Sequence, residues 1–111
     1  MKFITTITIL AASTFFSLVN AQYKKVYSYD KEQAGWAKVK TIGGTFGFID
    51  KNKKVVVQPV YAKIGKFNEY KQGWALVKNI SDGYGFIDNT GKEVVPATYT
   101  LEELKTKYNK K

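Results

Sequence analysis

A sequence unit that occurs twice, 38 residues apart, constrains the fold of this chain more than any other feature. The Gly-Trp-Ala segment at 35–40 returns at 73–78, and the aromatic-Gly-Phe-Ile-Asp segment at 46–50 returns at 84–88. Over 28 aligned positions, 14 are identical and no gap is needed. A fixed period of this length is typical of repeat proteins, in which each unit is one supersecondary element that stacks on the next.

The repeat begins before its most obvious motif. Tyr23 lies 38 residues before Tyr61, and the apolar positions that follow each of them also align. The chain therefore contains a part-unit at 23–34, a first repeat at 35–72 and a second repeat at 73–100.

Within a unit, the apolar pattern is that of strands. Residues 36–41 alternate between two faces, and a second aromatic and β-branched strand follows at 46–50. A third strand is expected from residue 54 to 57, ended by Pro59 in the first repeat and Pro96 in the second, because proline cannot donate to a strand ladder. Short turns join these strands, so each unit is predicted to be a three-stranded antiparallel meander in an all-β fold.

The repeat stops after Tyr99, and the pattern changes to that of a helix. Thr100 and Glu103 have the spacing of a capping box, in which each side chain bonds the other residue's backbone N–H. The expected apolar helical face consists of Leu101, Leu104 and Tyr108. We therefore predict a short C-terminal helix and tail at 101–111 that cap the array.

The combination of Gly-x-Ala-x-Val, aromatic-Gly-Phe-Ile-Asp, Gly-Lys-Glu-Val-Val-Pro and a trailing Tyr resembles the WG repeat family of bacterial exported proteins, over residues 23–100. In that family a Trp typically precedes the core Gly. Here Phe46 and Tyr84 stand at that place, and the tryptophans are Trp36 and Trp74. The resemblance implies a binding or scaffolding unit without an assigned common ligand. It implies no catalytic residues.

The first 21 residues have the parts of a secretory signal peptide. Lys2 precedes an uncharged, apolar and Thr-rich run, and a small residue, Ala21, stands at the expected cut. An uncleaved membrane anchor is the alternative, but the run is short of the ~20 clearly apolar residues that span a bilayer. We expect cleavage after Ala21, and a secreted or periplasmic mature protein with no transmembrane span.

The composition excludes several kinds of site. With neither His nor Cys in the sequence, zinc sites of the His/Cys type, Ser-His-Asp triads and disulfides are excluded. We expect no metal and no cofactor. The net charge is +9, and every basic residue is Lys. These lysines either attract an anionic surface or keep a strand-rich protein soluble, and their dispersion favours the second interpretation. Without Arg, nucleic acid is an unlikely partner.

Several aromatic and basic residues are candidates for a binding surface. Trp36 and Trp74 could stack on a ligand, although core packing is the favoured interpretation. A face that differs between the copies is where binding can diverge. That argument selects Tyr27, Tyr70, Tyr84, Lys63, Lys66, Lys71 and Lys78. In contrast, a large residue that recurs once per unit is expected in the core, as for Tyr23, Tyr61 and Tyr99.

Asp50 and Asp88 are the repeated carboxylates. A pair of carboxyl groups could serve a glycosidase, but each of these precedes a turn and belongs to a separate unit. A turn role is therefore favoured. The segment after Asp88 lacks the alternating oxygen ligands of a calcium loop.

Together these features predict an exported, non-enzymatic binding module that holds a protein partner or an anionic or glycan surface polymer. The alternatives are a structural scaffold of the cell envelope and, less favoured, a small glycan-active enzyme. The sequence leaves the partner's identity and the oligomeric state open.

Overall fold

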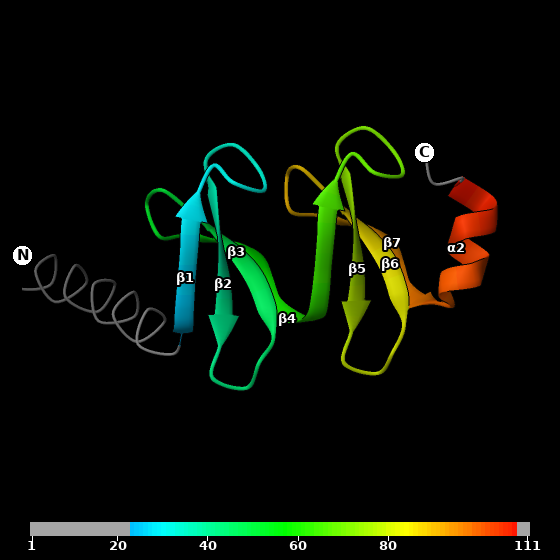
Figure 1. Cartoon of the computed structure of the whole chain (residues 1–111), viewed down its shortest axis with the longest axis horizontal. Helices are drawn as coiled ribbons and strands as arrows, with labels where there is room; N and C mark the ends of the chain where they lie inside the picture. Colours follow the sequence, from blue (N-terminus) through cyan, green and yellow to red (C-terminus); the bar gives the residue numbers. More distant parts are fainter. Residues whose placement is uncertain (1–22, 109–111) are drawn as a thin grey trace, which may run out of the picture.

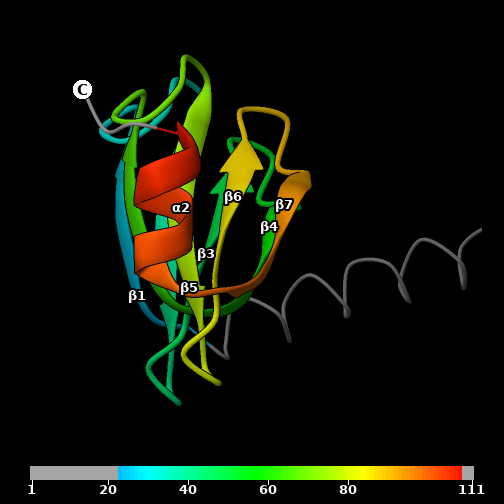
Figure 2. The same ribbon diagram turned by 90° about the vertical axis from the view of Figure 1, so that its right-hand side faces the viewer.

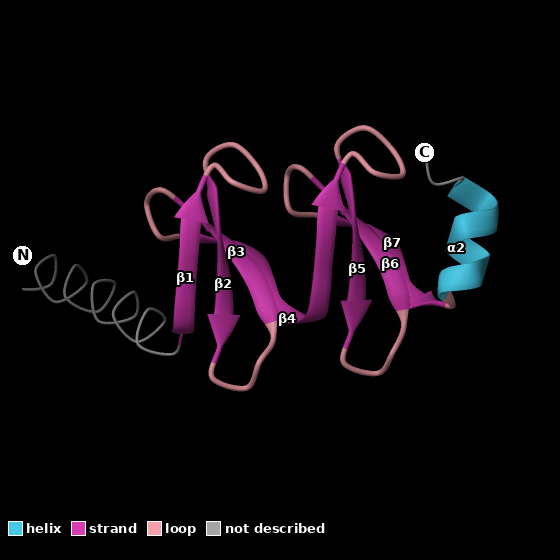
Figure 3. Cartoon of the chain, viewed as in Figure 1, coloured by secondary structure: helices cyan, strands magenta, loops and turns pink. Residues whose placement is uncertain are grey.

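Seven strands follow one another in a single antiparallel sheet, in the order β1 to β7, and a helix closes the chain (Figures 1 and 3). The structure is a computed structural model that describes residues 23–108, so the predicted signal peptide and its cut lie outside the described residues. The elements are β1 (Tyr23–Tyr29), β2 (Trp36–Thr41), β3 (Phe46–Asp50), β4 (Val55–Phe67), β5 (Trp74–Asn79), β6 (Tyr84–Asp88), β7 (Glu93–Tyr99) and α2 (Leu101–Tyr108). The predicted all-β meander with a C-terminal helix is confirmed.

Strand β4 makes the sheet coil. Its first half pairs with β3, where Val57 lies opposite Phe48, and its second half pairs with β5, where Ile64 lies opposite Val77. Viewed along the array, β1 and β5 lie on one side, and β6 and β7 lie on the other (Figure 2). Each repeat is therefore one turn of a coiled sheet, and the repeats succeed one another along its long axis.

The two prolines do not end strands, in contrast to the prediction. Pro59 lies inside β4 and Pro96 inside β7. The strand register explains this difference. Phe46 and Phe48 on β3 pair with Tyr61 and Val57 on β4, so the stretch of β4 between the paired residues is longer than the stretch of β3 opposite it. Such a bulge leaves a residue outside the ladder, and a proline there loses no hydrogen bond.

The bulge also explains the glycine of the repeated motif. A Cβ on Gly47 would lie 2.4 Å from the carbonyl oxygen of Val57, and one on Gly85 would lie 2.2 Å from that of Val95. Real carbon and oxygen atoms do not approach so closely. The residue after Phe46 or Tyr84 must therefore be glycine in both copies.

Each unit has two apolar faces that contribute to different clusters. Trp36 and Phe48 of the first repeat meet Ala75, Val77 and Ile87 of the second in the central cluster. The equivalents of those last three residues in the first repeat form the N-terminal cluster, made of Ala37, Val39 and Ile49. The core thus consists of contacts between successive units, as in a stacked repeat array.

Helix α2 covers the last unit. The predicted capping box is present: Thr100 N donates to Glu103 Oε1 at 2.8 Å, and Glu103 N donates to Thr100 Oγ1 at 3.1 Å. Leu104 is buried in a cluster with Tyr70, Phe86 and Val95. In the described segment, 23–108, no helix is long and apolar enough to cross a membrane.

Candidate functional site

Lysines face each other across neighbouring strands at two places in the array. Lys25 on β1 lies opposite Lys40 on β2, and Lys63 on β4 lies opposite Lys78 on β5. Residues directly opposite on antiparallel strands project from the same face, and like charges there destabilise the sheet. The array nevertheless carries this arrangement twice, with the two pairs one period apart.

An aromatic ring accompanies each lysine pair. Lys40 Nζ lies 5.6 Å from the centroid of the Phe46 ring, and Lys78 Nζ lies 5.8 Å from that of Tyr84. Lys38 Nζ also lies over Phe46, at 5.5 Å. At such distances a cation is attracted to the ring face. We call this surface the lysine–aromatic face, and define it as Lys25, Lys38, Lys40, Phe46, Lys63, Lys78 and Tyr84.

Few carboxylates neutralise the lysine–aromatic face. Lys78 Nζ lies 3.2 Å from Asp82 Oδ1, and the hydrogen bond with Asp82 raises the pKa of Lys78. Among residues 23–108, the other ion pair joins Lys51, in the turn after β3, to Asp30, in the loop after β1. The remaining lysines of the face therefore form no ion pair within the described part of the chain, and the face is positively charged.

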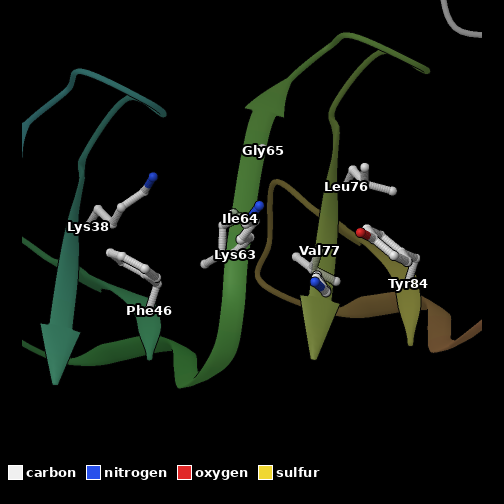
Figure 4. A pocket seen from close by; sticks show the side chains of 9 residues that line it. Lys38, Phe46, Lys63, Ile64, Gly65, Leu76, Val77 and Tyr84 are labelled. Carbon is white, nitrogen blue, oxygen red and sulfur yellow. The ribbon is translucent and has the colours of Figure 1, made fainter. Parts of the chain in front are cut away.

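A groove of about 340 Å³ opens on this face between the two repeats (Figure 4). Phe46 and Lys38 of the first repeat form one wall, and Tyr84 of the second forms the other. The floor is apolar and the amines of three lysines surround it. The lining residues are Lys38, Phe46, Lys63, Ile64, Gly65, Leu76, Val77, Lys78 and Tyr84. Its volume is in the range of sites that hold a small molecule or one side chain.

One residue that lines the groove differs between two successive copies of the unit. Gly65 lines the groove, and the residue 38 positions earlier is Tyr27. Each directly follows a residue with an equivalent strand partner: Val26, before Tyr27, pairs with Val39, and Ile64, before Gly65, pairs with Val77. In the first copy a phenol ring stands where the second copy has no side chain.

The structure brings together three of the predicted site residues, Lys63, Lys78 and Tyr84, in the groove. Tyr27 lies at the equivalent place in the first copy. Lys71 lies apart from them, with its Nζ 4.4 Å from the centroid of the Trp74 ring. Lys66 is exposed on β4 and does not line the groove.

Two of the candidates are buried. Trp36 is 8% exposed and Tyr70 is 6% exposed, so both belong to the core and not to a binding surface. Trp74 is half-buried. The difference in exposure between Trp36 and Trp74 follows from what covers each ring. Repeat two packs against Trp36, whereas α2 and the Lys71 side chain cover Trp74. The neighbouring Lys38 on β2 does not predict the exposure of either ring.

The recurring tyrosines differ in exposure as well. Tyr61 is 7% exposed and Tyr23 is half-buried, but Tyr99 is 40% exposed because within residues 23–108 no strand follows β7. The expected core position is therefore wrong for Tyr99. Burial and a hydrogen bond from Tyr61 Oη to the Glu93 carboxylate, at 2.5 Å, raise the pKa of the Tyr61 hydroxyl. This bond joins the two repeats.

The repeated aspartates have the predicted turn role. Asp50 Oδ1 accepts from the backbone N–H of Asn52 and Lys54, and Asp88 Oδ1 accepts from those of Thr90 and Lys92. Burial acts to raise the pKa of the Asp88 carboxyl, but these bonds and one from Thr90 Oγ1 outweigh it, and the pKa lies below its usual value. In residues 23–108, no group of three or more acidic side chains is arranged to hold a metal ion.

Isoleucines protrude at equivalent places beside two hairpin turns. Ile42 follows β2 and is 74% exposed, and Ile80 follows β5 and is 73% exposed. Val60, 53% exposed, lies with Ile80 beside a second hollow, which also contains Glu93. Apolar side chains exposed in this regular way are a further candidate contact surface.

Residue-by-residue comparison of the copies could have found more of the groove. Lys40 and Lys25 stand 38 positions before Lys78 and Lys63, so the alignment already contains the repeated lysines. It also places Gly65 against Tyr27. The missing information was the pairing of the strands, which makes each set of lysines neighbours.

Two segments of the chain, 46–79 and 84–101, match the family described as WG containing repeat. The first segment starts at the β3 aromatic and extends through β5, and the second starts at the β6 aromatic and extends into α2. No curated protein and no solved structure matches the chain.

Proposed function

Because the chain belongs to the WG repeat family, we propose that it is a non-enzymatic binding module that holds an anionic partner along the lysine–aromatic face. Residues 1–21 support an exported protein, so the partner is expected in the periplasm, at the cell surface or outside the cell.

The repeated pairing of lysines carries the proposal. Lys25 with Lys40 and Lys63 with Lys78 oppose like charges at the same place in two successive units. Opposed ammonium groups weaken a sheet unless an anion lies between or above them. A linear anionic partner that follows the array would meet both pairs in turn, and two linked contacts bind more tightly than either alone.

The other charged groups support a non-catalytic role. Asp50 and Asp88 use their carboxylates to hold turns, and each lies at the end of a different strand of the array. A general acid or base needs a carboxyl group that is available to a substrate. Binding therefore accounts for the exposed groups better than hydrolysis of a glycan does.

The experiment is a binding titration of the mature chain, residues 22–111, with poly-L-glutamate and with polygalacturonate at increasing salt. We expect affinity for at least one of them to fall steeply with ionic strength, because surface charge attraction is screened. The double variant Lys63→Ser/Lys78→Ser is expected to bind about tenfold more weakly.

The matched control is Lys105→Ser/Lys107→Ser, which removes the same charge from α2, away from the face. Its affinity should stay within about twofold of the parent, since dispersed surface charge contributes little to a specific contact. Equal losses in the two double variants, or binding that salt does not weaken, would contradict the proposal.

The exposed isoleucines favour a second candidate function, a scaffold that assembles through its hairpin tips. Under this hypothesis the mature chain associates with itself as its concentration rises, and Ile42→Ser/Ile80→Ser abolishes that association. Sedimentation velocity over a range of concentrations is the measurement. A chain that remains monomeric throughout excludes self-assembly by this route.

A further inference from the structure

We infer that the groove beside Gly65 receives the aromatic side chain of an acidic peptide segment, so that the anionic partner is a protein and not a polysaccharide. This inference rests on the proposed function, and it adds the chemical class of the partner and the place where its ring binds.

The first copy contains an internal example of such a ring. Tyr27 occupies the position equivalent to Gly65, and Lys25 Nζ lies 4.5 Å from the centroid of its ring. Lys63 is the equivalent of Lys25, and it lines the groove without an aromatic residue from its own strand. A ring supplied by a partner would restore at Lys63 the contact that Tyr27 makes at Lys25.

The walls of the groove suit an aromatic ring. Half-buried Leu76 supplies apolar surface above the buried Ile64 and Val77, and the rings of Phe46 and Tyr84 lie at either side (Figure 4). Aromatic pairs attract in tilted and edge-to-face arrangements, and the lysine amines attract a ring face. A phenyl or phenol ring thus finds a favourable contact on each side.

The polar groups of the groove do not suit a sugar ring. The polar side chains that line it carry the ammonium groups of three lysines, which only donate hydrogen bonds, and one phenol. The hydroxyl groups of a pyranose donate as well as accept, so several of them would lose water without gaining a partner. This chemistry favours a ring without hydroxyl groups around its edge.

The rim accounts for the acidic residues of the partner. Lys38 and Lys63 carry no ion pair within residues 23–108, whereas Lys78 is already paired with Asp82. The Glu69 carboxylate lies at the Gly65 end, where a Cβ on that glycine would be 4.0 Å from Glu69 Oε1. We therefore expect the partner's carboxylates to lie toward Lys38 and Lys63, flanking the inserted ring.

The test compares ligands and groove variants on the mature chain. The probes are a glutamate-rich peptide with one central Tyr, the same peptide with Ala at that position, and a galacturonate oligomer of equal charge, each titrated by fluorescence anisotropy. The parent chain should bind the Tyr peptide about tenfold more tightly than the Ala peptide.

The variant Gly65→Tyr places the tyrosine of the part-unit, Tyr27, at the equivalent position of the first repeat, and fills the groove while keeping every lysine. It should bind the two peptides equally, at the affinity of the Ala peptide. The matched control Gly65→Ala, whose Cβ would lie 3.4 Å from the Leu76 carbonyl oxygen, leaves most of the groove open and should keep the preference for Tyr.

The outcomes separate the inference from the function. Equal, salt-sensitive binding of both peptides to the parent chain overturns the inference and leaves the proposed function standing, whether or not Gly65→Tyr folds. Tighter binding of the galacturonate oligomer that Gly65→Tyr abolishes also overturns it, and assigns the groove to a sugar ring. Loss of salt-sensitive binding to all three probes overturns the proposed function itself.

Discussion

An aromatic face is covered at two places in the molecule: at the junction between the repeats, and at the C-terminal end of the second repeat. At the junction, Phe67 packs on Trp36 and Phe48, with ring centroids 5.9 and 6.1 Å apart. At the C-terminal end, Tyr108 of α2 packs on the equivalent rings, Trp74 and Phe86, at 5.5 and 5.2 Å. In the second repeat a short helix thus supplies the ring contacts that Phe67, at the end of β4, makes in the first repeat.

The replacement is incomplete, and the difference shows what a following repeat supplies. Trp36 is buried, whereas Trp74 is half-buried beneath the helix. The turn at Gly91 lies against the backbone of Val56, and β7 has no such turn beside it in the described chain. A helix can cover side chains, but the close backbone contacts between units need another repeat.

Gly91→Ala is expected to have the largest effect on stability, because it breaks the backbone contact that distinguishes the junction. The residue has φ +91°, and a Cβ there would lie 2.2 Å from the Val56 carbonyl oxygen. We expect the free energy of unfolding in urea to fall by roughly 3 kcal/mol.

Lys53 is the matched control, since it holds the equivalent turn position in the first repeat with φ +65° and is exposed. Lys53→Ala should change the free energy of unfolding by less than about 0.5 kcal/mol. A loss as large as that of Gly91→Ala would show that the turn conformation, and not the contact between repeats, decides the result.

Leu104→Ala tests the helical cap. Leu104 is 2% exposed, and its truncation should lower the free energy of unfolding by roughly 2–3 kcal/mol because it leaves a cavity beneath α2. In a Trp36→Phe background the emission of Trp74 should shift to the red. In a Trp74→Phe background the emission of Trp36 should not move. Equal shifts would indicate that the cap supports both repeats alike.

Thr100→Ala removes one side of the capping box and should cost about 1 kcal/mol, because the N–H of Glu103 loses its acceptor. The free energy of unfolding in urea measures this loss. Lys105→Ala, an exposed change in the same helix, is the control and should be close to neutral. A neutral Thr100→Ala would mean that packing alone holds α2 in place.

The smallest effect concerns pH and the turn of the second repeat. The pKa of Asp88 is lowered in the folded chain, so the carboxylate contributes stability at neutral pH that is lost as the pH falls through the ordinary carboxyl range and below. Asp88→Asn keeps an acceptor oxygen without the charge. Its stability should therefore decline less between pH 5 and pH 3, measured by thermal unfolding. An unchanged slope would contradict this role.

Local signals in the sequence predicted much of the fold. The 38-residue period can be seen by aligning the sequence with itself, and the alternation in β2, the aspartate turns and the capping box each depend on residues close together in the chain. All of them are present. The prediction that the prolines end strands is wrong because each bulge is defined by the register with a neighbouring strand, β3 for Pro59 and β6 for Pro96, which lies outside the local pattern.

The candidate site was less predictable, because exposure depends on the neighbouring unit. Tyr70 and Tyr99 illustrate this. Tyr70 is buried against Phe86, and Tyr99 is exposed because α2, and no further strand of the described segment, follows it. The lysine pairs could not be derived either, since they depend on which residue of β1 or β4 lies opposite β2 or β5.

The central claim is that the two copies share their architecture and differ at the groove, where Gly65 replaces Tyr27. The most direct test is a ¹H–¹⁵N NMR titration of the mature chain with the Tyr-containing glutamate peptide. The account predicts the largest backbone shifts at Gly65, Lys63 and Leu76, with small shifts at Tyr27. Equal shifts at Tyr27 and Gly65, or shifts confined to α2, would contradict it.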